Sequence, residues 1–362
     1  MDKRKNNITS AQLMGLIISI QVGVGMIGLP SNLATICGHD GWISALIYGI
    51  IITAVIALII KLMNRYNNKS LYEINKLLYG KYLGGLLNLL IVLYLWYSVC
   101  LCLRSYINVI HADLLRSTPT FVLCVFTLIP TCYLAWYGLK YVTRFAQMIY
   151  LSICFCLILF FLVFSDLRLN FLMPIAQSGI EGIKASFSPC IFAFLGYQVI
   201  SVIYPEITNK QKAMKFAIGA NIITTIFYVI MLLVTTSFFG EEMLKKSIYP
   251  MIKLSRSYRA PIIERMDVLF ISVWLPAMAM SIAGYFSVTY YSIRKLLNLK
   301  KKVIHLIVFT LITILLSNVP KSISNIKIYT NIMTISGTIF SIFLVTCYLV
   351  SFIRKKGVNP HV

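Results

Sequence analysis

Acidic residues are scarce in this chain: only 11 of its 362 residues are Asp or Glu. Charged residues of both signs make up 12%, about half of the ~25% that is usual in a soluble domain, while 59% of the residues are hydrophobic. So little charge cannot cover the surface of a soluble protein of this length. A disordered chain is excluded as well, because disorder requires low hydrophobicity. The composition therefore predicts a protein that lies in a membrane.

Arrangements of residues that could carry catalysis or hold a metal ion are also missing. The four histidines are scattered over loops and helix ends, and no nucleophile stands with a base and an orienting group. Two Cys-x-Cys pairs occur, at 100/102 and 154/156, but side chains two residues apart on a helix point ~200° apart and cannot share a metal. We expect no enzyme activity, no cofactor and no metal site.

What the chain does contain is a series of long apolar segments. A helix that crosses a bilayer needs ~20 mostly apolar residues. Ten such windows lie between charged residues, at 6–38, 41–60, 82–103, 117–139, 145–165, 185–205, 216–240, 268–293, 303–320 and 328–353. The expected fold is an all-α polytopic membrane protein in which residues 1–362 form a single transmembrane domain with ten transmembrane helices.

The basic residues indicate the orientation of these helices. Ten crossings leave both termini on one side, and that side carries 21 of the 33 Lys and Arg residues. Because Lys and Arg concentrate in cytoplasmic loops, we expect a cytoplasmic N-terminus at 1–9 and a cytoplasmic C-terminus at 354–362. The net charge of +22 then reflects topology, and nucleic acid is not an expected partner.

Two of the ten windows contain residues that interrupt a helix. The first holds the run GVGMIGLP at 23–30, and the sixth holds SPCIFAFLGYQ at 188–198. Each interior glycine costs a helix roughly 1 kcal/mol and an interior proline ~3 kcal/mol. Such breaks persist in hydrocarbon only where they face protein or a cavity. We therefore expect helices one and six to be discontinuous.

The positions of the two breaks predict an internal repeat. Each break lies in the first helix of a half of five helices, and the two halves span about 10–165 and 185–353. Since five is odd, the second half starts from the opposite side of the membrane, which is typical of an inverted-topology repeat with its substrate site between the broken helices. Glycine also allows helices to pack closely, so a packing role for either run remains an alternative.

Several short stretches carry a resemblance to a known family. They are ITSAQL at 8–13, the run at 23–30, LYEI at 71–74, LMPI at 172–175, FLGY at 194–197 and FISVW at 270–274. Together with ten spans they resemble the B subunits of spore germinant receptors, the GerAB-type spore germination permeases of the amino acid–polyamine–organocation transporter superfamily. Many of those proteins carry Glu after Gly-Tyr in helix six, where this chain has Gln198.

The resemblance implies a function and partners. Such subunits are thought to bind a small-molecule germinant, often an amino acid, and to act with an A subunit and a C-subunit lipoprotein in the spore inner membrane. The alternatives are an active secondary transporter for an amino acid or similar zwitterion, and a structural subunit that only scaffolds its partners. No Asp, Glu, Lys or Arg lies deep within any of the windows, which disfavours a proton-driven pump.

The expected ligand site lies between the two breaks. Backbone N–H groups at an unwound helix can hold a carboxylate, and aromatic faces attract an ammonium group. The candidate residues are Gly23, Val24, Gly25 and Met26 of helix one, Tyr97 and Cys100 of helix three, Phe194, Gly196, Tyr197 and Gln198 of helix six, and Trp274, Met278 and Ser281 of helix eight. Three have alternatives: a structural hydroxyl for Tyr97, an interfacial anchor for Trp274 and core packing for Met278.

Overall fold

The computed structural model describes residues 7–26, 28–257, 265–299, 302–319 and 323–354, and this part of the chain is almost entirely helical. The helices are α1 (Ser10–Gly25), α2 (Leu29–Cys37), α3 (Gly41–Arg65), α4 (Leu71–Asp113), α5 (Thr120–Tyr137), α6 (Leu139–Ala146), α7 (Ile149–Leu162), α8 (Gly179–Ala185), α9 (Phe187–Phe194), α10 (Val199–Ile203), α11 (Lys210–Lys245), α12 (Pro250–Ser257), α13 (Met266–Leu297), α14 (Lys302–Ser317) and α15 (Ile323–Ile353). Short 3₁₀ turns are η2 (Gly38–Asp40), η3 (Phe164–Asp166), η4 (Leu169–Leu172) and η5 (Tyr204–Glu206). The predicted all-α fold is confirmed.

Eight helical segments of the described chain are long and apolar enough to cross a membrane. They are Leu29–Arg65, Leu71–Asp113, Thr120–Tyr137, Leu139–Leu162, Phe187–Glu206, Lys210–Lys245, Met266–Leu297 and Asn325–Ile353. Two apolar helices are shorter, Ser10–Gly25 and Val303–Ser317, and they correspond to the first and ninth predicted windows. The count of ten is therefore reached only with these two included.

Both predicted helix breaks are present. α1 ends at Gly25, and α2 starts at Leu29 after Gly28, with Pro30 in its first turn, where a missing N–H costs little. α9 ends at Phe194 and α10 starts at Val199. Between them Leu195 is extended and Gly196 has φ +121°, a backbone conformation that side chains with a Cβ rarely adopt.

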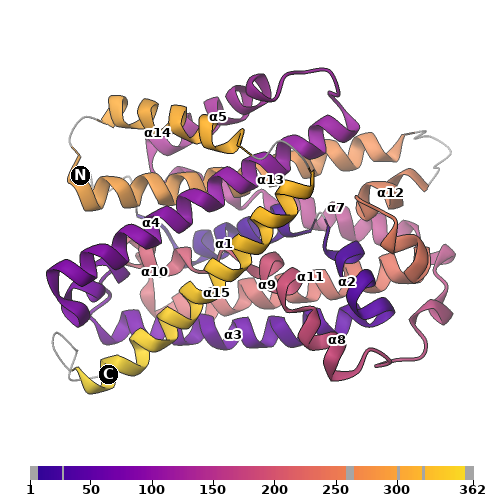
Figure 1. Cartoon of the computed structure of the whole chain (residues 1–362), viewed down its shortest axis with the longest axis horizontal. Coiled ribbons are helices and arrows are strands. Elements are labelled where there is room, and N and C mark those ends of the chain that lie inside the picture. Colours follow the sequence, from indigo (N-terminus) through magenta and orange to yellow (C-terminus); the bar gives the residue numbers. More distant parts are fainter. Residues whose placement is uncertain (1–6, 27, 258–264, 300–301, 320–322, 355–362) are drawn as a thin grey trace.

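The two broken helices run in opposite directions. At one end of the molecule, Ser10 at the start of α1 donates its hydroxyl proton to the carbonyl of Asn209, which follows α10 (2.6 Å). At the other end, the Cys37 thiol at the end of α2 donates to the carbonyl of Gly182 in α8, just before α9 (3.1 Å). We call the first the terminal end, because α1 begins there and α15 ends there (Figure 1), and the second the far end.

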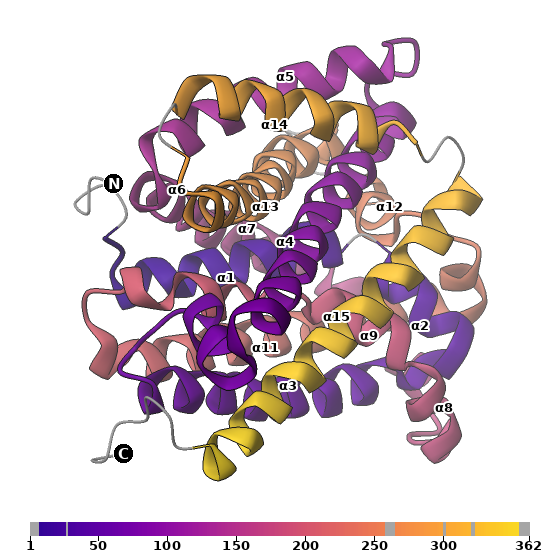
Figure 2. The same cartoon turned by 60° about the vertical axis from the view of Figure 1, so that its left-hand side comes forward.

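α1 lies in the middle of the molecule. It packs against α11 and α13 most extensively, and also against α4, α6 and α9, as Figure 2 shows. Thirteen of its 16 residues are buried. A helix that is apolar on all sides and buried is a core helix. The peripheral α14, by contrast, exposes large apolar side chains such as Leu311 and Leu315, which is the pattern of a surface that faces lipid.

α4 is longer than its predicted window of 82–103. It runs to Asp113, so Arg104, which the window boundaries place near a helix end, lies inside the helix and is 8% exposed. At its other end the helix continues back to Leu71 across a kink at Gly80, whose φ is +81°.

Candidate ligand site at the broken helices

A buried polar brace joins the two broken helices. The Gln21 side chain of α1 donates its amide to the carbonyl of Phe194 (2.9 Å) and to the side-chain oxygen of Asn221 in α11 (3.1 Å). The Tyr228 hydroxyl of α11 reaches the carbonyls of Gln21 (2.8 Å) and Ala193 (3.2 Å). The last carbonyls of a helix have no partner within it. The brace supplies donors to the end of α9 and so stabilises the break.

Loss of the Tyr228 hydroxyl is expected to destabilise the fold. Tyr228→Phe removes the side-chain donor to two buried carbonyls, which costs about 1–3 kcal/mol. Thermal unfolding in detergent measures the change. Tyr285→Phe is the matched control, since Tyr285 is equally buried but its hydroxyl has no partner. Equal midpoints for the two variants would show that the brace does not stabilise the break.

Two buried tyrosine hydroxyls without hydrogen-bond partners lie beside the second break. They belong to Tyr285 of α13 and Tyr94 of α4. The Tyr285 oxygen is 3.5 Å from the position that a Cβ on Gly196 would occupy. The Tyr94 oxygen is 3.1 Å from the position that a Cβ on Gly337 would occupy, and the side chain of Leu195 lies at the same place. A buried polar group without a partner is unusual in a folded protein and requires an explanation.

Three of the four predicted residues of helix six form the break itself. Gln198 accepts the Gly196 N–H with its side-chain oxygen (2.9 Å) and donates its amide to Ser341 of α15 (3.3 Å). The Tyr197 hydroxyl also contacts the Ser341 hydroxyl (2.6 Å). The fourth, Phe194, packs edge-on against Tyr228. Gln198 and Tyr197 therefore dock the break onto α15.

The predicted residues of helix one lie at the break, but their backbone N–H groups lie in the last turn of α1 or directly after it, and not in an unwound segment. Val24 and Gly25 belong to the last turn of α1, and the N–H of Met26 donates to the carbonyl of Val24. In this structure the hydrogen bonds of α1 use the N–H groups of its final turn, so carboxylate binding by these amides stays a prediction. Gly25 instead permits close packing: a Cβ there would lie 2.5 Å from the Tyr228 oxygen.

The predicted residues of helix eight are all buried on α13. The Ser281 hydroxyl donates to the carbonyl of Ser19 in α1 (2.5 Å), and a Cβ on Gly23 would overlap it. Gly23 is thus a point of close contact between α1 and α13. Met278 is fully buried, and Trp274 stacks on Phe270 with its indole N–H buried and without a partner.

The two predicted residues of helix three lie elsewhere. Tyr97 and Cys100 line a cavity of about 380 Å³ between α4, α14 and α15, and none of the described residues of either break lines it. The Tyr97 hydroxyl is already bonded to the carbonyl of Tyr329 (2.7 Å). Leu93 and Leu316 of the same lining are exposed large apolar residues, so the cavity lies toward the lipid-facing side of the protein.

The sequence analysis therefore missed Tyr94, Tyr285, Gln21 and Asn221. The sequence carries no signal that favours Tyr94 over Tyr97, because apolar residues surround both positions on α4. The pairing of Gln21 with Asn221 spans 200 residues and leaves no local pattern.

Comparison with known proteins is consistent with this geometry. A family model, Spore_permease, described as a spore germination protein, matches residues 7–326. The chain belongs to this family. It is 30% identical over 306 residues to spore germination protein GerQB of Bacillus cereus, with 83% of each chain covered. It is 25% identical over 362 residues to spore germination protein B2 of Bacillus subtilis (strain 168), with 98% of each covered.

Solved structures with the same fold are membrane transporters. MhsT in complex with L-phenylalanine superposes with a TM-score of 0.64 at 14% identity, covering 92% of this chain and 88% of that one. A substrate-bound Na⁺-coupled sialic acid symporter also gives 0.64, at 12% identity, covering 97% and 80%. The spore permease is thus an integral membrane protein with a transporter-like fold, and the resemblance indicated by its short motifs is confirmed.

Proposed function

We propose that this spore permease is the germinant-sensing membrane subunit of a spore germination receptor. Its ligand is a small polar molecule, an amino acid in the first instance, held beside the break between α9 and α10. The observation that carries the proposal is the pair of buried, unpartnered tyrosine hydroxyls at the second break, with that of Tyr285 next to Gly196 and that of Tyr94 next to Gly337, where Leu195 packs. A ligand with hydrogen-bonding groups would offset the cost of burying them.

We interpret the packing at this break as a closed state of the proposed site. The side chain of Ile20 in α1 fills the space beside Gly196, since a Cβ on Gly196 would overlap its methyl group. The side chain of Leu195 likewise fills the space beside Gly337 of α15, since a Cβ on Gly337 would overlap a methyl group of Leu195. A ligand therefore enters as these two side chains move, and its binding favours one arrangement of the half-helices over the other. That shift is the signal we assign to the protein.

The proposal also assigns the protein to a receptor complex and gives its orientation in the membrane. The relatives are spore germination proteins, which supports membership of a receptor with an A subunit and a C-subunit lipoprotein in the spore inner membrane. Because the loops predicted on the side of both termini hold 21 of the 33 Lys and Arg residues, the terminal end would face the cytoplasm. The far end would then face away from the cytoplasm.

Thermal unfolding against a panel of amino acids, sugars and nucleosides tests the proposal. A ligand that binds only the folded protein stabilises it by ~2.7 kcal/mol at a hundredfold excess over Kd. We expect one compound class to raise the unfolding midpoint. If no compound does so, for the chain alone and for the chain purified with the A and C subunits, the sensing role is wrong and a scaffolding role gains support.

A second candidate is active transport of an amino acid or similar zwitterion. It is favoured by the fold shared with a protein solved with L-phenylalanine and with a Na⁺-coupled symporter. Uptake of the stabilising compound into liposomes separates the two functions. Concentrative uptake driven by an ion gradient indicates a transporter, whereas binding without flux indicates a sensor.

A further inference from the structure

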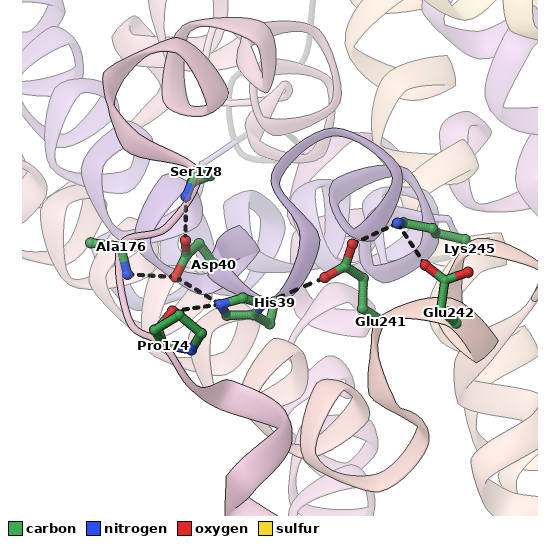
Figure 3. Close-up of polar contacts among 8 residues, drawn as sticks. All are labelled: His39, Asp40, Pro174, Ala176, Ser178, Glu241, Glu242 and Lys245. Atoms are coloured by element: carbon green, nitrogen blue, oxygen red, sulfur yellow. Dashed lines mark hydrogen bonds and ion pairs between the residues drawn. The ribbon is translucent and has the colours of Figure 1, made fainter.

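Two regions outside the broken helices could hold a further partner: a polar cluster at the far end and the cavity beside α4. In the polar cluster, which Figure 3 shows, the charged groups use one another and the backbone as partners. Asp40 of η2 accepts the N–H groups of Ala176 and Ser178, both at 2.8 Å. Lys245 of α11 pairs with Glu241 (2.5 Å). The cavity is different, because protein interiors contain few voids larger than a water molecule and a space of about 380 Å³ points to an occupant.

Three helices come together at this cavity. α4 passes between α14 and α15 (Figure 2), and it contributes Trp96 and Tyr97 to the lining. Leu316 lies at the end of α14, Val319 follows that helix, and Tyr329 belongs to α15. The rings of Tyr97 and Tyr329 stack with their centroids 6.3 Å apart. The walls are therefore built from aromatic rings and aliphatic side chains.

The polar groups that α4 brings to the lining are already bonded within the protein. The indole N–H of Trp96 donates to the hydroxyl of Thr313 in α14 (2.9 Å). The Tyr97 hydroxyl donates to the carbonyl of Tyr329 (2.7 Å). A polar molecule that enters such a cavity gives up its hydrogen bonds to water and finds these groups paired, which is costly. An apolar molecule gains by leaving water and loses no hydrogen bond. The lining therefore favours an apolar occupant.

The cavity is continuous with the lipid-facing surface. Leu93, Leu316 and Val319 line it and are each about half exposed. The segments of α4 and α14 on which the lining lies, 82–103 and 303–319, contain no Asp, Glu, Lys or Arg. Such segments match the hydrocarbon core of a bilayer, where the surrounding molecules are acyl chains. The medium that reaches the cavity is thus acyl chain and neither headgroup nor water.

We propose that this cavity is a binding site for an acyl chain of a bilayer lipid. The chain enters past the exposed lining residues and packs against the rings of Trp96 and Tyr97. Because the cavity lies where α4 meets both α14 and α15, a bound chain contacts all three helices and stabilises their packing. This site is separate from the one proposed at the second break, since none of the described residues of either break lines the cavity.

Quenching of Trp96 fluorescence by a phospholipid with brominated acyl chains tests the proposal, because bromine atoms quench tryptophan only at close range. The other three tryptophans are first replaced, as Trp42→Phe, Trp136→Phe and Trp274→Phe. The protein is purified in a steroid-based detergent, which has no alkyl chain that could compete. We expect the brominated lipid to cause a saturable loss of Trp96 emission, and an excess of the same lipid without bromine to reverse that loss.

Cys100→Phe and Leu90→Phe form a matched pair on α4. Cys100 lines the cavity, so the added ring would take the space of the chain, whereas Leu90 is exposed and lies outside the lining. Cys100→Phe should abolish the saturable loss of emission, and Leu90→Phe should keep it. Should Cys100→Phe fail to fold, Leu316→Phe enlarges an exposed residue of the same lining and gives the same comparison.

Three results would overturn the proposal. One is a loss of emission that does not saturate, and another is a loss that is equal in the two variants. Either would mean that lipid touches only the outer surface of the protein. The third is no loss of emission with the lipid at all. If the compound found in the thermal panel changes the emission of Trp96 instead, the cavity binds that compound and not an acyl chain.

Discussion

Replacing both Tyr94 and Tyr285 by Phe should weaken binding of the proposed ligand about 30-fold without harming the fold. Each hydroxyl that bonds the ligand contributes about 1 kcal/mol or more to affinity, and 1.4 kcal/mol corresponds to a factor of ten. Because neither hydroxyl has a partner in the ligand-free protein, its removal relieves a buried, unsatisfied group. The ligand-free midpoint should stay the same or rise while the ligand-induced shift falls. Titration calorimetry with the compound found in the panel measures the affinity.

A ligand-free midpoint that stays the same or rises, together with a smaller ligand-induced shift, distinguishes a ligand-binding role of these hydroxyls from a structural role. Tyr97→Phe is the matched control on α4, since its hydroxyl bonds the carbonyl of Tyr329 beside the lipid-facing cavity. It should lower the ligand-free midpoint and leave the affinity unchanged. If Tyr97→Phe weakens binding and the double variant does not, the ligand occupies that cavity instead of the break.

Gly196→Ala should be strongly destabilising. A residue with a Cβ at φ +121° carries ~1–3 kcal/mol of backbone strain. The added methyl group would also overlap Cγ2 of Ile20, and overpacking of this kind costs a further ~1–3 kcal/mol. A combined loss of about 2–6 kcal/mol is a large part of a typical folding free energy of ~5–15 kcal/mol. Thermal unfolding in detergent gives the value.

A second substitution separates the two causes. Ile20→Ala in the Gly196→Ala background removes the overlapping methyl group, so it should recover the packing cost but not the backbone strain. Gly219→Ala in α11 is the control, because nothing lies within 4 Å of its added Cβ, and it should be neutral or slightly stabilising. A Gly196→Ala protein as stable as Gly219→Ala would mean that the backbone at 196 does not require glycine.

The breaks were readable from the sequence because their causes are local. Glycine and proline weaken a helix wherever they stand, and an apolar segment of fixed length either spans a bilayer or does not. The same locality explains why the ends of α4 were misjudged. Its kink at Gly80 and its extension past Arg104 depend on the helices that pack around it. A window whose bounds are set by charged residues alone does not predict either feature.

Only part of the candidate site could be predicted from the sequence. The sequence placed Gly196, Tyr197 and Gln198 at the second break, and they lie there. It also assigned carboxylate binding to amides that α1 uses internally, and it chose Tyr97 over Tyr94. The side of α4 that faces the break is set by how that helix is rotated against α13 and α15. Apolar residues surround α4 on most sides, so its pattern does not specify that rotation.

By itself, then, the sequence determined a membrane-embedded, all-helical chain with two interrupted helices, because composition, hydropathy and backbone propensity are properties of short segments. Only the tertiary structure decided which polar groups meet. Gln21 reaches Asn221 across 200 residues, and His39 reaches Glu241 across 202. A buried polar contact depends on the position and orientation of both partners, and helix packing alone brings such distant residues together.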